Sequence, residues 1–234
     1  IILTILVLYG SASMFSQVYG AQEPEALPGI AGKDTPSPPV GPDFKFTHLS
    51  LEDGLSQTAV APILQDSRGF MWFGTQDGLN RYDGYNFVVY RNDPGNLTSL
   101  GGNQIWAIIE DPAGILWIGT AEGGLNKYDP DTDTFIHYRH DPGNPNSLKN
   151  DMVLGIWQDE AGLLWLNMAD GWLTKFNPLS ETFTHYQPIP AKPSGSTTNR
   201  TKPVYQDKTG TLWLSNYKGG LARLNRETGR FTYF

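Results

Sequence analysis

Four cationic residues stand at the same position of a repeated sequence unit, which makes them candidates for binding chemistry. They are Arg81, Lys127, Lys175 and Arg223. A cation repeated in this way could bind an anionic ligand, such as a uronate or sulfate group on a glycan. It could equally form an ion pair with an acidic side chain of the adjacent unit. Of these two interpretations we favour the ion pair.

Trp172 is a candidate of another kind, because it departs from the repeat. It replaces the second glycine of a Gly-Gly pair, and nearby Asn167 and Met168 replace a Gly-Thr pair. Residues that break a repeat could line a ligand surface, and Trp106, Trp157 and Trp172 have flat apolar faces that suit stacking on sugar rings. Trp106 and Trp157 lie on the first predicted strand of their units, where we favour core packing.

Catalytic and metal-binding motifs are missing from the chain. It has no G-x-S-x-G, H-E-x-x-H or G-x-x-x-x-G-K signature. Asp129, Asp131 and Asp133 alternate like the start of a calcium loop, but the following Gly and the bidentate Glu of that loop are absent, so we predict a turn. The acidic residues that stand out are turn residues of the repeat.

Three histidines occupy matching positions in the predicted fourth strands, where other units have Val89 or Tyr233. These are His48, His137 and His185. Exchange with valine and tyrosine is typical of a packing position. We therefore predict no catalytic residue, no cofactor and no metal in this chain.

The repeat itself is seen in four strings that align without a gap. They are ILQDSRGFMWFGT (63–75), IIEDPAGILWIGT (108–120), IWQDEAGLLWLNM (156–168) and VYQDKTGTLWLSN (204–216). In each string an Asp precedes a Gly by three residues and the Gly precedes a Trp by three. This structural repeat motif consists of Asp66, Gly69 and Trp72; Asp111, Gly114 and Trp117; Asp159, Gly162 and Trp165; and Asp207, Gly210 and Trp213. We assign it to a tight turn followed by a core tryptophan.

Each unit of 45 to 48 residues has the periodicity of four short strands separated by turns. A four-stranded sheet cannot bury both faces alone, whereas radial stacking of similar sheets buries them against one another. We therefore predict an all-β fold built of four-stranded antiparallel β-propeller blades. Four blades are present, and the ring is expected to be incomplete.

The predicted organisation has three parts. Residues 1–21 are apolar and then small, which is typical of the remnant of an export signal, although a buried strand or a membrane anchor would also fit. Residues 22–43 form a Pro-rich disordered spacer, and residues 44–234 form a partial propeller. Within it we expect a strand at 44–55 that completes a missing last blade, and blades at 56–92, 103–140, 150–187 and 201–234.

Composition narrows the range of partners. The chain of 234 residues has no Cys and a formal net charge of −7, with 17 Lys and Arg residues scattered along it. The absence of Cys excludes disulfides. The negative net charge and the scattered basic residues disfavour general binding to nucleic acid or to an anionic membrane surface. The linkers Asp93-Pro94-Gly95-Asn96 and 141–146 suit turn-rich crossings between blades better than ligand contact.

The phrases EDPAGILWIGTAEGGLNKYDPDTDTFIHY and YRHDPGNPNSLKNDMVLGIWQDEAGLLW, with the opening FTHLSLEDGLSQ, resemble the propeller repeats of two-component regulators. The resemblance covers 44–234, although unit four departs from it over 187–203. It implies the periplasmic sensor region of a hybrid histidine kinase or, less often, of a diguanylate cyclase. In such a receptor further blades, a membrane helix and cytoplasmic signalling domains lie beyond residue 234, and a homodimer is compatible with this architecture.

The leading functional hypothesis is thus an extracytoplasmic ligand-sensing propeller, not itself an enzyme, that binds a small molecule or oligosaccharide. On this hypothesis the full-length protein lies in the inner membrane. Two alternatives stay open, because one fold hosts many functions: an exported propeller enzyme, such as a lyase or glycosidase acting on glycans, and a protein-interaction scaffold. Turnover of a glycan would favour the enzyme, and signalling modules after residue 234 would favour the sensor.

Overall fold

The computed structural model describes residues 46–187, 201–216, 220–226 and 228–234. The predicted export signal and spacer, the first two residues of the predicted strand at 44–55, and most of the linker before unit four lie outside these ranges. Within them the regular structure consists of β-strands, and no helix is long and apolar enough to cross a membrane.

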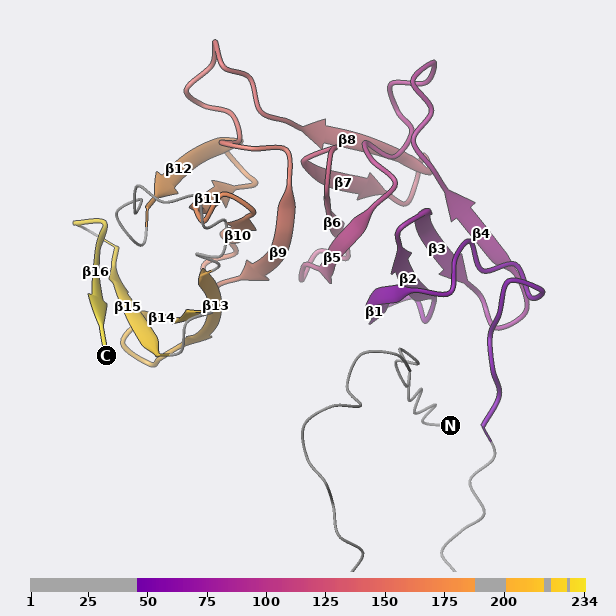
Figure 1. The fold of residues 1–234 in the computed structure, drawn as a ribbon, viewed down its shortest axis with the longest axis horizontal. Helices are drawn as coiled ribbons and strands as arrows, with labels where there is room; N and C mark the ends of the chain where they lie inside the picture. Colours follow the sequence, from indigo (N-terminus) through magenta and orange to yellow (C-terminus); the bar gives the residue numbers. More distant parts are fainter. Residues whose placement is uncertain (1–45, 188–200, 217–219, 227) are drawn as a thin grey trace, which may run out of the picture. The chain divides into compact units, whose positions relative to one another are not determined.

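Four antiparallel sheets of four strands each follow one another along the chain, as Figure 1 shows from indigo to yellow. Each sheet is one blade, with its strands in chain order. Blade 1 contains β1 (Val60–Gln65), β2 (Met71–Thr75), β3 (Gly78–Tyr82) and β4 (Phe87–Tyr90); blade 2 contains β5 (Ile105–Glu110), β6 (Leu116–Thr120), β7 (Leu125–Asp129) and β8 (Thr134–Tyr138); blade 3 contains β9 (Val153–Gln158), β10 (Leu164–Met168), β11 (Leu173–Asn177) and β12 (Thr182–Tyr186); blade 4 contains β13 (Thr201–Gln206), β14 (Leu212–Asn216), β15 (Leu221–Asn225) and β16 (Arg230–Tyr233). The predicted fold class is confirmed.

The turn between the first and second strands of each blade explains the repeated glycine. Gly69, Gly114, Gly162 and Gly210 have φ angles of 93°, 80°, 79° and 81°, which residues with a Cβ rarely adopt. In each of these turns the glycine N–H donates to the carbonyl of the motif aspartate at 2.8 or 2.9 Å. The local sequence therefore determines where each first hairpin reverses.

One face of each of the first three sheets packs on the following blade, and we call this face and its equivalent in blade 4 the forward face. It carries the motif tryptophan and the first leucine of the third strand, as Trp72 and Leu79 do in blade 1, where both are fully buried. The core between blades 1 and 2 joins them to Ile105, Ile118 and other apolar residues of blade 2. Equivalent clusters lie between blades 2 and 3 and between blades 3 and 4.

Neighbouring blades also align at one end, where each linker enters a first strand and the second strand turns into the third. We call it the linker end. There Gly78 N–H donates to the Asn103 carbonyl at 2.8 Å, and Gly124 N–H donates to the Asp151 carbonyl at 2.9 Å. Each bond joins the β2–β3 or β6–β7 turn of one blade to the linker that enters the next. Loops at the linker end of successive blades are therefore neighbours.

The linkers themselves run beside the outer strand of the blade they enter. Phe135 N–H of β8 donates to the Thr98 carbonyl at 2.8 Å, and Phe183 N–H of β12 donates to Asn146 Oδ1 at 2.8 Å. They thus occupy part of an edge whose backbone groups would otherwise lack partners.

Residues 46–50, which belong to the predicted strand at 44–55, form no strand in this structure. A fourth strand needs a third strand beside it to bond its backbone groups. That this segment completes a further blade stays a prediction.

Candidate functional site

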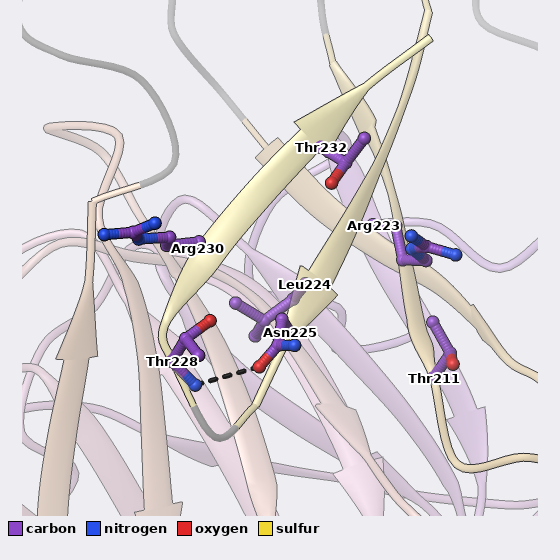
Figure 2. A pocket seen from close by; sticks show the side chains of 7 residues that line it. All are labelled: Thr211, Arg223, Leu224, Asn225, Thr228, Arg230 and Thr232. Carbon is purple, nitrogen blue, oxygen red and sulfur yellow. Dashed lines mark hydrogen bonds between the residues drawn. The ribbon is translucent and has the colours of Figure 1, made fainter.

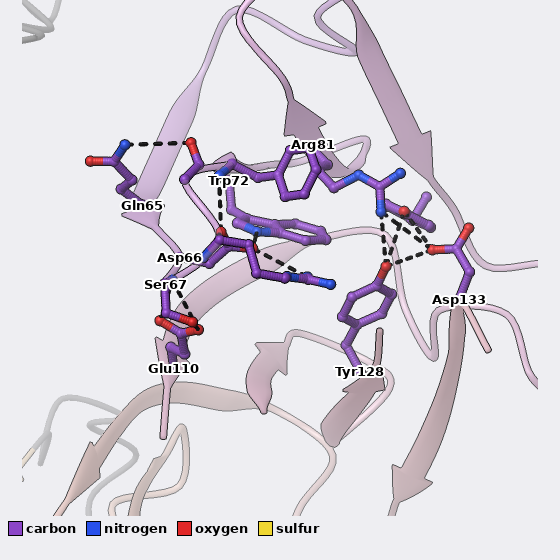
Figure 3. Close-up of polar contacts among 12 residues, drawn as sticks. Gln65, Asp66, Ser67, Trp72, Arg81, Glu110, Tyr128 and Asp133 are labelled. Atoms are coloured by element: carbon purple, nitrogen blue, oxygen red, sulfur yellow. Dashed lines mark hydrogen bonds and ion pairs between the residues drawn. The ribbon is translucent and has the colours of Figure 1, made fainter. Parts of the chain in front are cut away.

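The aspartate of each motif accepts hydrogen bonds from its own blade, as Figure 3 shows for Asp66. Asp66 Oδ1 accepts the N–H groups of Arg68 and Phe70 at 3.0 and 2.9 Å, and Oδ2 accepts the indole Nε1–H of Trp72 at 2.9 Å. The other three indole-to-aspartate bonds are 2.9 or 3.0 Å long. In blade 4 the bonds from Thr209 and Trp213 lower the pKa of Asp207 to about 2. These contacts join the turn to the core tryptophan.

The four repeated cations lie on four different sheets, so the structure does not bring them together into one site. Each pairs in register with the motif tryptophan of its own blade. The pairs are Arg81 with Trp72, Lys127 with Trp117, Lys175 with Trp165 and Arg223 with Trp213. Their side chains therefore share the forward face of each blade.

Arg81 contacts blade 2 through this face (Figure 3). Its Nη1 lies 3.0 Å from Tyr128 Oη and 3.6 Å from Asp133 Oδ1. Its guanidinium also lies 5.9 Å from the ring centroid of Trp72. In blade 2 the Lys127 ammonium lies at the same distance, 5.9 Å, from the ring of Trp117. These contacts favour the interpretation of Arg81 as an ion-pair residue between blades.

Arg223 has different surroundings (Figure 2). It is exposed, and it lines a pocket on the forward face of blade 4 together with Thr211, Arg230 and Thr232. Leu221 on the same face is 46% exposed, whereas its counterparts in blades 1 to 3 are fully buried. Lys175 is half-buried opposite Trp165. For Lys175 and Arg223, both interpretations therefore stay predictions.

A set of bonds between blades was not foreseen from the sequence. Tyr90 Oη donates to Asp133 Oδ1 at 2.7 Å, and Tyr138 Oη donates to Glu181 Oε1 at 2.7 Å. Both acceptors lie in the last turn of the following blade with positive φ, 56° for Asp133 and 53° for Glu181. We call each of these contacts a tyrosine clasp. The available signal was the tyrosine that ends FVVY, FIHY and FTHY.

Blade 3 departs from the repeat at its linker end, where Trp172 lies. In blade 2 the turn uses Gly124 with φ 70°, and a Cβ there would collide with the Tyr138 carbonyl. In blade 3 the positive φ, 88°, moves to Gly171, whose N–H donates to the Met168 carbonyl at 3.1 Å. The turn is rebuilt so that a large side chain fits at position 172.

The rebuilt turn brings Trp172 beside a lysine from the linker. Trp172 is half-buried and packs on the core between blades 2 and 3. The ammonium of the exposed Lys149 lies 5.6 Å from the centroid of its ring. Asp170 Oδ1 accepts the backbone N–H of Trp172 at 3.3 Å. Trp172 was a candidate ligand-binding residue from the sequence, and that role stays a prediction, whereas Lys149 was not among the candidates.

A second change in blade 3 accompanies Lys149. The equivalent residue in blade 2 is Gly101, where an added Cβ would lie 2.5 Å from Asn126 Oδ1. Blade 3 has Thr174 in place of Asn126, a shorter side chain whose Oγ1 lies 3.0 Å from His185 Nδ1. The sequence signal was available, because Lys149 and Thr174 depart from the repeat 48 residues after Gly101 and Asn126.

The histidines make structural contacts with linkers and neighbouring strands. His137 Nε2 lies 2.6 Å from the Ser99 carbonyl. In blade 3, burial and the nearby Lys149 ammonium lower the pKa of His185, while the Ser147 backbone and Asp170 oppose this effect. No group of three or more His, Asp or Glu that could hold a metal ion occurs in the part of the chain that the structure describes.

Trp106 corrects one prediction. The residue is 37% exposed, so the interpretation of Trp106 as a core residue is wrong. The reason is a break in the β5–β6 register between Ile105 and Ala107, a β-bulge that leaves Trp106 without a cross-strand partner. Trp157, by contrast, is half-buried against the core between blades 3 and 4. Trp106 and Trp172 both lie at the linker end of their blades.

Comparison with known proteins agrees with the repeat. A family model described as a two component regulator propeller matches residues 99–122, which include all of β5 and β6. Over 58 residues the chain is 48% identical to Histidine kinase P4 of Formosa agariphila. This matched segment covers 25% of this chain and 4% of that protein.

Solved structures share the blade architecture. The extracellular domain of the hybrid two-component system BT3049 from B. thetaiotaomicron superimposes with a TM-score of 0.70 and 29% identity, over 80% of this chain and 26% of that one. Virginiamycin B lyase from Staphylococcus aureus has a TM-score of 0.54 and 18% identity, over 75% of this chain and 55% of that one, and shows the fold alone.

The four sheets, their stacking and the repeated turn define a segment of a β-propeller. Residues 99–122 match the two-component regulator propeller repeat, and the resemblance to this family noted from the sequence is confirmed.

Proposed function

We propose that this chain is part of the extracytoplasmic, ligand-sensing propeller of a transmembrane two-component receptor, and that its ligand is an oligosaccharide. Similarity to the extracellular domain of a hybrid two-component system supports the location and the sensing role. On this proposal the propeller is not catalytic, and further blades, the membrane segment and a kinase or cyclase module belong to other parts of the receptor.

The observation that carries the proposal is the linker end of blades 2 and 3. Two large aromatic side chains, Trp106 and Trp172, are only partly buried there, and Trp172 stands where the other three blades have a glycine. Binding sites combine aromatic side chains with a few polar groups, and loops held by a rigid scaffold are where such sites concentrate. Lys149 and Asp170 supply the polar groups beside Trp172.

The experiment is a titration of the purified protein with a panel of oligosaccharides, followed by calorimetry and by tryptophan fluorescence. We expect saturable binding that quenches or shifts the emission, and we expect Trp106→Ala and Trp172→Gly to weaken it. Glycine is the matched choice at position 172, because blade 2 has Gly124 there. A panel without any binding would contradict the sensing role.

The same samples separate the sensor from the enzyme. After prolonged incubation with each bound oligosaccharide, we expect the saccharide to be recovered intact by mass spectrometry. Release of shorter products, or of unsaturated products typical of a lyase, would favour the propeller enzyme.

Export has its own test. Residues 1–43 fused to a reporter enzyme that is active only outside the cytoplasm should produce activity. Deletion of the apolar segment Ile1 to Tyr9 should abolish that activity. Equal activity with and without the segment would contradict this assignment.

A further inference from the structure

The linker end of blade 3 has a chemical character that blades 1 and 2 lack at the same place. Three repeat positions change together relative to blade 2: Gly101 becomes Lys149, Gly124 becomes Trp172 and Asn126 becomes Thr174. In blade 2, a Cβ at Gly101 would lie 2.5 Å from Asn126 Oδ1, and one at Gly124 would collide with the Tyr138 carbonyl. In blade 3 the turn and the neighbouring residue changed together with the lysine and the tryptophan.

Folding alone does not account for the two large side chains. Blade 2 closes the same turn with glycines, with Gly123 N–H donating to Thr120 Oγ1 at 2.8 Å and Gly101 N–H donating to Asn126 Oδ1 at 2.7 Å. Blade 3 has Met168 and Thr174 in place of these two acceptors, and it has the exposed Lys149 and the half-buried Trp172 in place of the two glycines Gly101 and Gly124. Such a departure from local consistency is expected at functional positions.

The ammonium of Lys149 is available for an anion. Four arginines of the described residues have carboxylate partners, namely Arg68, Arg81, Arg91 and Arg226. Within the same ranges Lys149 forms no ion pair, and its ammonium lies 5.6 Å from the Trp172 ring. A cation held over an aromatic ring keeps its charge exposed while its position is restrained. Lys149 therefore presents a positioned positive charge beside an apolar face.

An indole face next to an ammonium matches a sugar ring that bears a carboxylate. The apolar face of a pyranose packs on the indole, and the carboxylate accepts charge-assisted hydrogen bonds from the ammonium. The exposed Asp170 accepts the Trp172 backbone N–H, and it is placed to accept hydrogen bonds from sugar hydroxyls. Resting on the proposed function, we propose that Lys149 and Trp172 form a subsite for an acidic pyranose, of the uronic acid class, within an oligosaccharide.

The test compares three ligands that separate the charge from the ring. These are an oligogalacturonate, its fully methyl-esterified form of the same length, and inorganic phosphate. For the wild-type protein, we expect the oligogalacturonate to bind at least about tenfold more tightly than the ester and phosphate not to compete, since both ring and charge contribute. Raising the salt concentration should reduce this preference, because the exposed charge is screened.

Three variants assign the effect to residues. Lys149→Gln should remove the preference for the acidic form and leave the ester unchanged, because Lys149 is exposed and its loss does not disturb the core. Trp172→Gly should weaken both forms. Lys208→Gln is the matched control. Lys208 is an exposed lysine in the β13–β14 turn, at the end of blade 4 that lies opposite the linker end. Its replacement should leave the affinity for both forms unchanged.

The outcomes separate this subsite from the sensing role. Equal affinity of the wild-type protein for acid and ester, an unchanged preference in Lys149→Gln, or no binding of oligogalacturonate would overturn the acidic subsite. If the protein then still binds another oligosaccharide, the proposed sensing function stands. Competition by phosphate as strong as by oligogalacturonate would show a simple anion site and would also overturn the proposal.

Discussion

The carboxylate of the motif aspartate accepts at least three hydrogen bonds in each blade. Asp111 accepts backbone N–H groups from Ala113 and Ile115 at 2.9 and 3.0 Å and the indole N–H of Trp117 at 2.9 Å. Both carboxylate oxygens are therefore acceptors, which a carboxamide cannot reproduce. This explains why an aspartate, rather than an asparagine, stands at this position in all four units.

Asp111→Asn should destabilise the protein by about 1–3 kcal/mol, because its amide group would face N–H donors and leave at least one of them unpaired near the core. Urea unfolding measures the change. Asp93→Asn is the control: Asp93 bonds Gly95 N–H through Oδ1 alone in an exposed linker, so the carboxamide retains that bond. Similar losses of stability in both variants would contradict the three-bond role.

His185 gives the stability a dependence on pH. Its pKa lies below the usual 6.5 in the folded state, mainly through burial and then through the Lys149 ammonium. As pH falls below about 6.5 the unfolded chain takes up a proton before the folded chain does, so stability decreases with decreasing pH. We expect this loss between neutral pH and pH 5 to be smaller in His185→Gln, as measured by urea unfolding at a series of pH values.

Asp170 supplies a check on that prediction. Its charge opposes the lowering of the His185 pKa, so Asp170→Asn should make the loss at low pH begin at the same pH but become larger. Identical pH profiles for all three proteins would exclude His185 as the titrating group.

The tyrosine clasps show how one blade holds the next through its last turn. The hydroxyl of Tyr138 reaches Glu181 across the junction of blades 2 and 3, while its ring lies 6.1 Å from that of Trp117. Burial, followed by the bond to Glu181, raises the pKa of Tyr138. The phenol therefore stays protonated and keeps donating over the physiological range.

Tyr138→Phe should lower the free energy of unfolding by about 0.5–1.5 kcal/mol, the usual net value of a hydrogen bond. The chain offers a matched control, because Tyr186 has the same place in blade 3 while Gly229 takes the place of Glu181 in blade 4. Tyr186→Phe should therefore have an effect within about 0.5 kcal/mol. A larger loss in Tyr186→Phe than in Tyr138→Phe would refute the clasp.

The molecule as a whole is held together by junctions of different chemistry. Blades 1 and 2 are joined by the Tyr90 clasp and by Glu110, which accepts the Ser67 N–H and hydroxyl. At the junction of blades 3 and 4 there is instead an arginine: Arg226 Nη1 lies 3.0 Å from Asp159 Oδ2, and its guanidinium lies 5.3 Å from the Trp165 ring. One side chain thus contacts the motif aspartate and the motif tryptophan of the previous blade.

Arg226→Met should loosen blade 4 selectively. Hydrogen exchange should become faster in β14 and β15 while β2 and β3 stay protected, because local opening follows the contacts that are lost. Arg230→Met is the control, since Arg230 is an exposed arginine of the same blade. Uniformly faster exchange in all four blades would show that the junction does not act locally.

The number of blades, their strands and the role of the Asp-Gly-Trp motif were predictable from the sequence. The indole N–H of Trp72 bonds an aspartate only six residues away, and the same spacing recurs in every unit. Interactions that are local and periodic leave a pattern along the chain. The change of residue at Trp172 was visible in the sequence for the same reason, because the other units have a glycine at this position.

Contacts between blades depended on the tertiary structure. Tyr90 meets Asp133 over 43 residues, and Arg226 meets Asp159 over 67, so their proximity depends on how the sheets stack. The exposure of Trp106 depends on a bulge, and the pairing of Trp172 with Lys149 depends on a rebuilt turn meeting a linker. Spacing along the chain specifies which face of a strand a residue occupies, whereas packing of one sheet on the next decides what that face touches.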